Sequence, residues 1–217
     1  GIISVEMSRD QIIDRFIASQ AQIPLWRLRS GRLNDELEFA LVQQALDELS
    51  KAPIFIDDSS SPTILQMRSI ARRLQLEHKL DLLIVDYIQL IRPNTSSDNV
   101  VAQVSEISRG LKALARELNI PVLALSQLSR DIEKRDSKLP RLSDLRESGS
   151  LEQDADVVMF LSRDMNERTD LPEESQGIVK VFVQKHRNGP TGTFELGFDK
   201  ERASFRNIDA VHIPEDY

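Results

Sequence analysis

Short apolar stretches alternate along the chain with longer stretches in which apolar residues recur every three or four positions. The short stretches are rich in Ile and Val and occupy residues 2–6, 54–57, 82–86, 122–127 and 157–161. Alternation of buried strands with amphipathic helices is typical of β-α-β units. The pattern therefore predicts an α/β fold with a mostly parallel β-sheet flanked by helices.

Capping signals predict where the helices between these strands begin. Ser8 and Gln11 have the spacing of a capping box, and Thr63 can cap a later helix directly after Pro62. The last apolar stripe predicts the longest helix, over about residues 99 to 118. The stripes expected to face the core are Ile12, Ile13, Phe16 and Ile17; Leu37, Leu41, Ala45 and Leu49; Ile64, Met67, Ala71 and Leu74; and Val104, Ile107, Leu111, Leu114 and Leu118.

The pattern changes toward the carboxyl terminus. Residues 179–183 carry valine at every second position, residues 187–190 form a turn signal, and residues 192–198 return the chain. This predicts an antiparallel hairpin at the carboxy-terminal edge of the sheet. The polar stretches 131–147 and 164–177 are expected to be loops.

Composition fits one globular domain, with 217 residues of which 40% are hydrophobic and 29% charged. The absence of cysteine excludes disulfides and thiolate metal sites and is usual for a cytosolic protein. No apolar stretch approaches the roughly 18 residues of a membrane span, and residues 1–6 lack the layout of a signal peptide. We therefore expect a cytoplasmic protein that does not contact a membrane.

Charge and histidine spacing exclude two further classes. The net charge of −7 has the wrong sign for a protein that coats nucleic acid by bulk attraction, so any contact with nucleic acid must be local. The three histidines are far apart in sequence and no spacing such as His-Glu-x-x-His occurs. We therefore expect no zinc site built from protein ligands.

Three polar side chains end predicted strands at one edge of the sheet, where open α/β sheets bind ligands. Asp86 could hold the Mg²⁺ of a nucleotide through water, and Glu6 could orient a water molecule. The amide of Gln127 could sense a γ-phosphate. Taken singly, Asp86 could instead cap a turn, Glu6 could be an acid favoured near a helix start, and Gln127 could be a turn residue in water.

Five motifs resemble those of the DnaB family of bacterial replicative DNA helicases and occur in the family's order. They read ISVEMS from residue 3, LIVDYIQL from residue 83, LALSQLSR from residue 123, LSDLRESGSLEQDAD from residue 142 and KHRNGPTG from residue 185. The resemblance covers essentially the whole chain. It implies that residues 1–217 form a RecA-like helicase motor domain that works as a homohexamer and hydrolyses ATP.

The resemblance also implies a role for each residue at the sheet edge. Glu6 would polarise the attacking water, Asp86 would support Mg²⁺ through water, and Gln127 would couple the state of the nucleotide to DNA. Arg15 would be an accessory contact to the nucleotide. The implied cofactors are therefore ATP and Mg²⁺.

The last two motifs imply contacts beyond the chain itself. Lys185 and Arg187 would reach the nucleotide of the neighbouring subunit, where Arg187 would act as an arginine finger. Arg146, Glu147 and Gly149 would line the channel of the ring and hold the phosphates of single-stranded DNA. Six copies would focus these few basic groups on the pore while the outside stays acidic.

One expected part of such a motor does not occur in the sequence. The phosphate cradle Gly-x-x-x-x-Gly-Lys-[Ser/Thr] is absent, and in the resembled family it lies one strand and one helix before the ISVEMS motif. We therefore expect an amino-terminally truncated domain without the first strand, the phosphate-binding loop and the first helix. The chain itself should then hydrolyse ATP poorly or not at all, and a sheet edge would be exposed.

The missing cradle leaves a second interpretation open. The chain could be a non-catalytic adaptor that keeps the RecA-like fold and its interfaces. A third possibility is another RecA-like ring or filament ATPase, either a strand-exchange recombinase or a DnaB-like helicase of an organelle or phage. Recombinases lack the motif around residues 146–156. The family further implies a primase and a helicase loader as partners.

Overall fold

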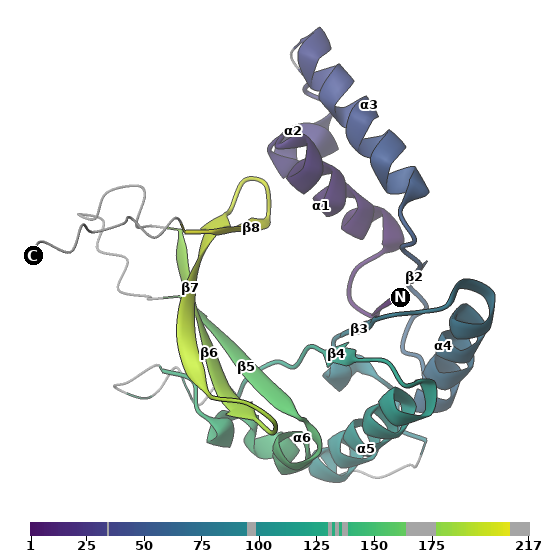
Figure 1. The fold of residues 1–217 in the computed structure, drawn as a ribbon, viewed down its shortest axis with the longest axis vertical. Helices are drawn as coiled ribbons and strands as arrows, with labels where there is room; N and C mark the ends of the chain where they lie inside the picture. The colour runs from purple at the N-terminus through teal and green to yellow at the C-terminus, as the bar shows by residue number, and fades with distance from the viewer. Residues whose placement is uncertain are drawn as a thin grey trace, which may run out of the picture.

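The computed structural model describes residues 1–33, 35–94, 99–129, 132, 135, 139–163 and 177–208, and only the backbone of residues 146–148. The described strands form two four-stranded sheets, in the orders β2-β1-β3-β4 and β5-β6-β7-β8. Figure 1 shows the second sheet across the molecule from α1 and α3, with α5 and α6 along the side that joins the two parts. The α/β class is thus confirmed.

The first sheet is parallel throughout and contains the strands predicted from the first four apolar stretches. Each strand is shorter than its stretch, because the flanking residues turn into the connections. The strands are β1, Ile2–Ser4; β2, Ile56–Asp57; β3, Leu83–Asp86; and β4, Val122–Ala124.

Two helices pack on the first sheet and bury its central strands. They are α4, Ile64–His78, and α5, Val100–Leu118, which is the predicted longest helix. The predicted cap of α4 is present, since Thr63 and Gln66 form a capping box. Side chains of this core that are at most 1% exposed are Ile3, Met67, Ala71, Leu83, Val85, Ile88 and Leu114.

A second, smaller core lies between the helices that follow β1. These are α1, Arg9–Ala21; α2, Leu25–Ser30, which was not predicted; and α3, Glu36–Lys51. The predicted buried stripe of α3 is wrong at its start, because Leu37 and Leu41 are exposed. The packed face is rotated toward Val42, Ala45 and Leu49.

The second sheet is antiparallel throughout. Its strands are β5, Val157–Arg163; β6, Ile178–His186; β7, Gly192–Asp199; and β8, Ser204–Asn207. The predicted hairpin is confirmed as β6 and β7, although it belongs to this separate sheet, and β8 was not predicted. Residues 157–161 were predicted to join the parallel sheet, whereas among the described residues β5 pairs with β6 alone and with no strand of that sheet.

Two short helical segments connect to β5. They are η3, Leu142–Ser148, and α6, Gly149–Asp154. The prediction of a loop over residues 131–147 was therefore wrong from Leu142 onward, where the Asp144 carboxylate accepts from the Arg141 amide over 2.7 Å and stabilises the first turn. Residues 164–176, most of the other predicted loop, lie outside the described residues.

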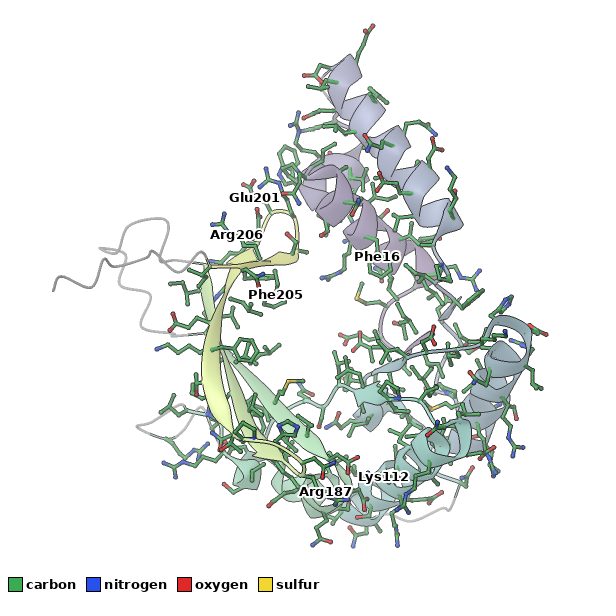
Figure 2. The ribbon with its side chains drawn as sticks, viewed as in Figure 1. Phe16, Lys112, Arg187, Glu201, Phe205 and Arg206 are labelled. Atoms are coloured by element: carbon green, nitrogen blue, oxygen red, sulfur yellow. The ribbon has the colours of Figure 1, made fainter. Side chains whose placement is uncertain are left out.

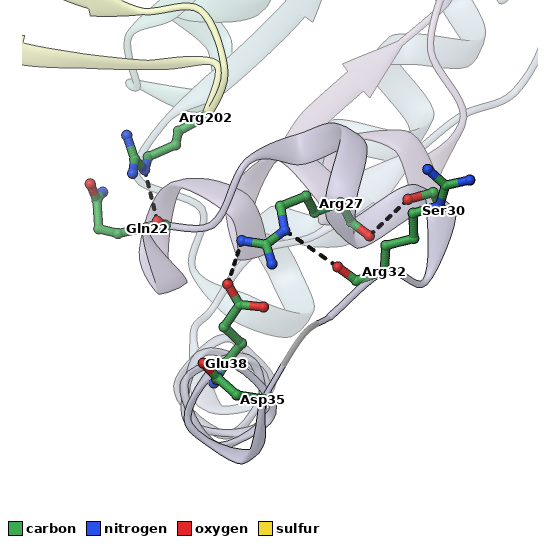
Figure 3. A network of polar contacts seen from close by, with 7 residues as sticks. All are labelled: Gln22, Arg27, Ser30, Arg32, Asp35, Glu38 and Arg202. Carbon is green, nitrogen blue, oxygen red and sulfur yellow. Dashed lines mark hydrogen bonds and ion pairs between the residues drawn. The ribbon is translucent and has the colours of Figure 1, made fainter.

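Polar contacts fasten the far end of the second sheet to the small helical core (Figure 3). Arg202, in the turn between β7 and β8, donates from Nε to the Gln22 carbonyl oxygen at the end of α1 over 2.7 Å. The same arginine forms a 2.6 Å ion pair with Asp199. A 2.6 Å ion pair between Arg27 and Glu38 ties α2 to α3. The second sheet is therefore held at its β7–β8 turn as well as through α6.

Truncating Leu83 should test the central core. Leu83 is fully buried, so Leu83→Ala should lower the free energy of unfolding by about 3 kcal/mol through lost burial and the cavity left behind. Leu76→Ala is the matched control, because Leu76 is 85% exposed on α4 and its loss should cost less than about 0.5 kcal/mol. Denaturant unfolding measures both changes, and equal effects would contradict the described core.

Candidate functional site

Two carboxylates lie at the carboxyl edge of the first sheet, one at the end of β3 and one just after β1. Ser4 of β1 lies opposite Asp86 of β3, and the Val5 amide donates to the Asp86 carbonyl oxygen over 2.7 Å. Glu6 follows at the same carboxyl edge and is exposed, whereas Asp86 is half-buried. Neither carboxylate makes a hydrogen bond or ion pair with any residue that the structure describes. Both side chains are therefore available to a ligand or to water.

Polar contacts fix the turn that carries Glu6. The buried Ser4 hydroxyl donates to the Met7 carbonyl oxygen over 2.8 Å and accepts from the Met7 amide over 3.2 Å. Ser8 then caps α1 in the predicted capping box with Gln11. The backbone is thus held on both sides of Glu6.

Gln127 lies just beyond β4, and Gln89 holds its backbone. The Gln89 Nε2 donates to Ser126 Oγ over 2.8 Å and to the Gln127 carbonyl oxygen over 3.2 Å, and its Oε1 accepts from the Gln127 amide over 3.3 Å. Gln89 belongs to η1, Ile88–Leu90, shortly after Asp86. The sequence prediction assigned it no role, and its only signal is one amide side chain in a mostly apolar stretch.

Further contacts connect Gln127 to the segment that carries the proposed DNA motif. The Ser129 amide donates to the Asp144 carbonyl oxygen over 3.2 Å, and Leu128 packs against the buried Leu145. These residues and Gln127 line a small pocket. The end of β4 and the start of η3 are therefore joined by both a hydrogen bond and apolar packing.

The residues predicted to contact DNA lie at the junction of η3 and α6. The side chains of Arg146 and Glu147 are outside the described part of the chain. Gly149 is the first residue of α6, is exposed and has ordinary right-handed helical angles. A Cβ added to Gly149 would meet nothing within 4 Å, so neither backbone conformation nor crowding within the described chain requires glycine there.

The two cations predicted to act on a neighbour lie at the carboxyl end of α6. The Lys185 ammonium donates to the Glu152 carbonyl oxygen, and Arg187 Nη2 donates to the Gln153 carbonyl oxygen over 3.3 Å. Arg187 also pairs with Asp156, with 3.1 Å between Nη1 and Oδ1. Carbonyl oxygens at the end of a helix attract positive charge. The sequence prediction did not identify Asp156 as a partner.

Neither cation forms a hydrogen bond or an ion pair with Glu6 or Asp86 of the same chain. The carboxylate that holds Arg187 also binds Lys112 of α5. Lys112 is also distant from the pocket beside Gln127. Val104 lines that pocket, and the eight residue steps of α5 from Val104 to Lys112 span roughly 12 Å. Figure 2 shows Arg187 beside Lys112 and well away from Phe16 on α1.

Arg15 and the possible metal ligands are the remaining candidates for contact with a nucleotide. Arg15 lies on the exposed side of α1 and forms no hydrogen bond or ion pair with the described residues. No group of three or more Asp, Glu or His among the described residues could hold a metal ion. A lone half-buried Asp86 suits a magnesium ion held through water and phosphate oxygens. No described helix is long and apolar enough to cross a bilayer.

This arrangement of strands and polar side chains has counterparts among known proteins. The family model of the DnaB-like helicase C-terminal domain matches residues 1–207. The chain belongs to this family.

Members of the DnaB-like family match nearly the whole chain. The replicative DNA helicase DnaB of Geobacillus stearothermophilus is 46% identical over 219 residues, which cover 99% of this chain and 48% of that protein. The replicative DNA helicase DnaC of Bacillus subtilis is 44% identical and covers 96% of this chain and 46% of that protein. The chain thus spans about half the length of the curated relatives it matches.

Solved structures identify the fold of this DnaB-like domain as RecA-like. A DnaB-like replicative helicase, described with its interactions with primase, is 39% identical, with a TM-score of 0.88 and coverage of 96% of this chain and 51% of that chain. A solved ATPase domain is 39% identical with a TM-score of 0.89, and the match covers 96% of this chain and 74% of that chain. The RadB recombinase, at 18% identity and a TM-score of 0.51, shares the fold alone.

Replacing Gln89 should loosen the backbone at Gln127. Gln89→Leu keeps the side-chain size but removes its hydrogen bonds, so the Gln127 amide should exchange its hydrogen roughly fivefold faster, as expected for a net loss of about 1 kcal/mol. Gln43→Leu on α3 is the control and should leave this amide unchanged. Amide exchange followed by NMR would contradict the described clamp if Gln127 exchanged at the same rate in both variants.

Proposed function

We propose that this chain is the motor part of a hexameric replicative DNA helicase that couples ATP hydrolysis to translocation on single-stranded DNA and to duplex unwinding. The observation that supports the proposal is that Arg187 is held by Asp156 and the end of α6, and forms no hydrogen bond or ion pair with Glu6 or Asp86 of the same chain. An ATP-hydrolysing site needs both kinds of group beside one nucleotide. Neighbouring copies in a ring would bring the acids of one chain to the cations of the next.

The side chains at the sheet edge suit ATP hydrolysis. Glu6, free of partners within the described chain and held on a fixed turn, would orient the attacking water and accept its proton. Asp86 would hold Mg²⁺ through water, and the bound ion would neutralise phosphate charge. Gln127 would sense the terminal phosphate, and Arg15 would be an accessory contact. Lys185 and Arg187 would stabilise charge on the nucleotide of the adjacent copy.

Two open strand edges suggest where the phosphate-binding loop enters the fold. Among the described residues, β4 pairs with β3 alone and β5 with β6 alone. Apolar side chains on these two strands and just beyond β4 are between 42% and 59% exposed: Leu123, Leu125, Met159 and Leu161. Because sheet edges are normally covered, we propose that another strand of the same protein lies between β4 and β5 and carries the loop. Without it, the chain would hydrolyse ATP poorly or not at all.

The segment around Gly149 suits contact with a DNA backbone. The open space around Gly149 leaves room for a phosphate to approach the amides of η3 and α6. Arg146 and Glu147 immediately precede this point in the sequence. A few basic groups from each copy would line a central channel, which is compatible with a net charge of −7 for each chain.

Partners follow from the same assignment. A DnaB-like helicase of known structure is described with its interactions with primase, and we propose a primase and a helicase loader as partners of this protein. Work at a bacterial replication fork would place it in the cytoplasm. These partners would bind the complete protein. This chain itself spans about half the length of the relatives it matches.

Replacing Arg187 tests the proposed function. In the complete motor assembled on single-stranded DNA, Arg187→Ala should lower ATP turnover by about 10³-fold and abolish unwinding, because the arginine finger is lost. Nucleotide binding should stay within about twofold, since the site of each chain is otherwise intact. Arg206→Ala, an exposed arginine on β8, is the control and should behave like the parent protein. Unwinding that persists in Arg187→Ala would overturn the assignment.

A further inference from the structure

The cations at the end of β6 share one set of contacts with the end of α6. Lys185 is the second-last residue of β6, and Arg187 is the first residue of the turn that follows. Both donate to the last carbonyl oxygens of α6, at Glu152 and Gln153. A hydrogen bond of 2.8 Å from the Arg187 amide to the Asp156 carbonyl oxygen adds a backbone contact. The guanidinium and its backbone are thus held by the same short segment.

Asp156 is the one carboxylate that pairs with Arg187 in the described chain, and α5 holds it from the other side. Its Oδ1 faces Arg187 and its Oδ2 accepts from the Lys112 ammonium. The hydrogen bond from Lys112, aided by the nearby positive charges, outweighs desolvation and holds the pKa of Asp156 below its usual range. Asp156 therefore remains ionised at neutral pH and connects Arg187 to α5.

The ion pair between Asp156 and Arg187 can orient the guanidinium but adds little to the folding stability of the chain. Their side chains are 52% and 49% exposed, and ion pairs this exposed contribute little to folding. A phosphate of a neighbouring nucleotide could therefore take over the guanidinium at small cost. Until then, the pair and the hydrogen bond to the Gln153 carbonyl oxygen together favour the rotamer of Arg187 that the structure describes.

Helix α6 is anchored to α5 near its carboxyl end. Its amino end lies in residues 146–149, which we call the DNA segment because they are proposed to contact DNA. The buried Ser108 hydroxyl of α5 donates to Asp154 Oδ2 over 2.7 Å. Helix α6 begins at Gly149, directly after residues 146–148. One helical element of six residues thus has the DNA segment at its amino end and the two cations at its carboxyl end.

We propose that Asp156 and the carboxyl end of α6 form a cradle that positions Lys185 and Arg187 for the nucleotide of the neighbouring subunit. Asp156 is a positioning residue, since it acts through Arg187 and does not touch the nucleotide. This proposal rests on the proposed function. Because the same helix begins at the DNA segment, a shift of that segment on DNA would move the cradle and its cations with it.

Substitutions at Asp156 test the cradle in the complete motor with a single-stranded oligonucleotide as the DNA. Asp156→Asn keeps the shape but removes the charge that orients Arg187, so kcat for ATP should fall roughly tenfold while KM stays within about twofold. Asp156→Glu restores the charge and should recover at least about half of the parent kcat. Asp199→Asn removes a comparable pair, with Arg202, far from α6 and should leave both constants unchanged.

The outcomes separate the cradle from the proposed function. If Asp156→Asn turned over ATP like the parent while Arg187→Ala did not, the cradle would be wrong and the motor assignment would stand. If Asp156→Asn and Asp156→Glu were equally impaired, or if the loss came with a lower unfolding midpoint, Asp156 would have a merely structural role. If Arg187→Ala itself kept full turnover, both proposals would fail.

Discussion

Parallel pairing of β1 with β3 inside the buried core is the constraint on which the rest of the structure depends. Ile3, Leu83 and Val85 are almost completely buried, so a shift of one residue in register would move polar side chains into the core. Because Ser4 then lies opposite Asp86, the following turn leaves Glu6 at the same edge. The buried core residues of β1 and β3 therefore determine the positions of the two carboxylates of the proposed nucleotide site.

Helix α5 contacts both the pocket beside Gln127 and the carboxylate that holds Arg187. Three of its residues recur at intervals of four, which places them along one face of the helix. Val104 lines the pocket beside Gln127, Ser108 binds Asp154 of α6, and Lys112 binds the carboxylate that holds Arg187. Gln127, the carboxyl end of α6 and the two cations that we propose to act on the neighbouring subunit are thus arranged along a single helix. This arrangement explains how one chain could hold both halves of a site without assembling it alone.

Much of this could be predicted from sequence because local rules determine it. Apolar stretches fixed the parallel strands, the Ser8 and Thr63 caps fixed two helix starts, and strand ends located Glu6 and Asp86. The separate antiparallel sheet could not be predicted, because partner choice for β5 depends on long-range pairing. The hydrogen bonds of Gln89 and the pairing of Asp156 were missed for the same reason, since each joins residues more than thirty positions apart.

Mixing two inactive variants tests directly whether one nucleotide site is shared by two chains. Glu6→Gln removes the water-orienting acid and Arg187→Ala removes the cation, so each complete motor alone should hydrolyse ATP very slowly. Random mixed rings would contain, at roughly a quarter of their interfaces, an intact Glu6 facing an intact Arg187. ATP turnover in the mixture should therefore be well above that of either variant. Turnover that never exceeds the two separate rates, in rings shown to exchange subunits, would contradict it.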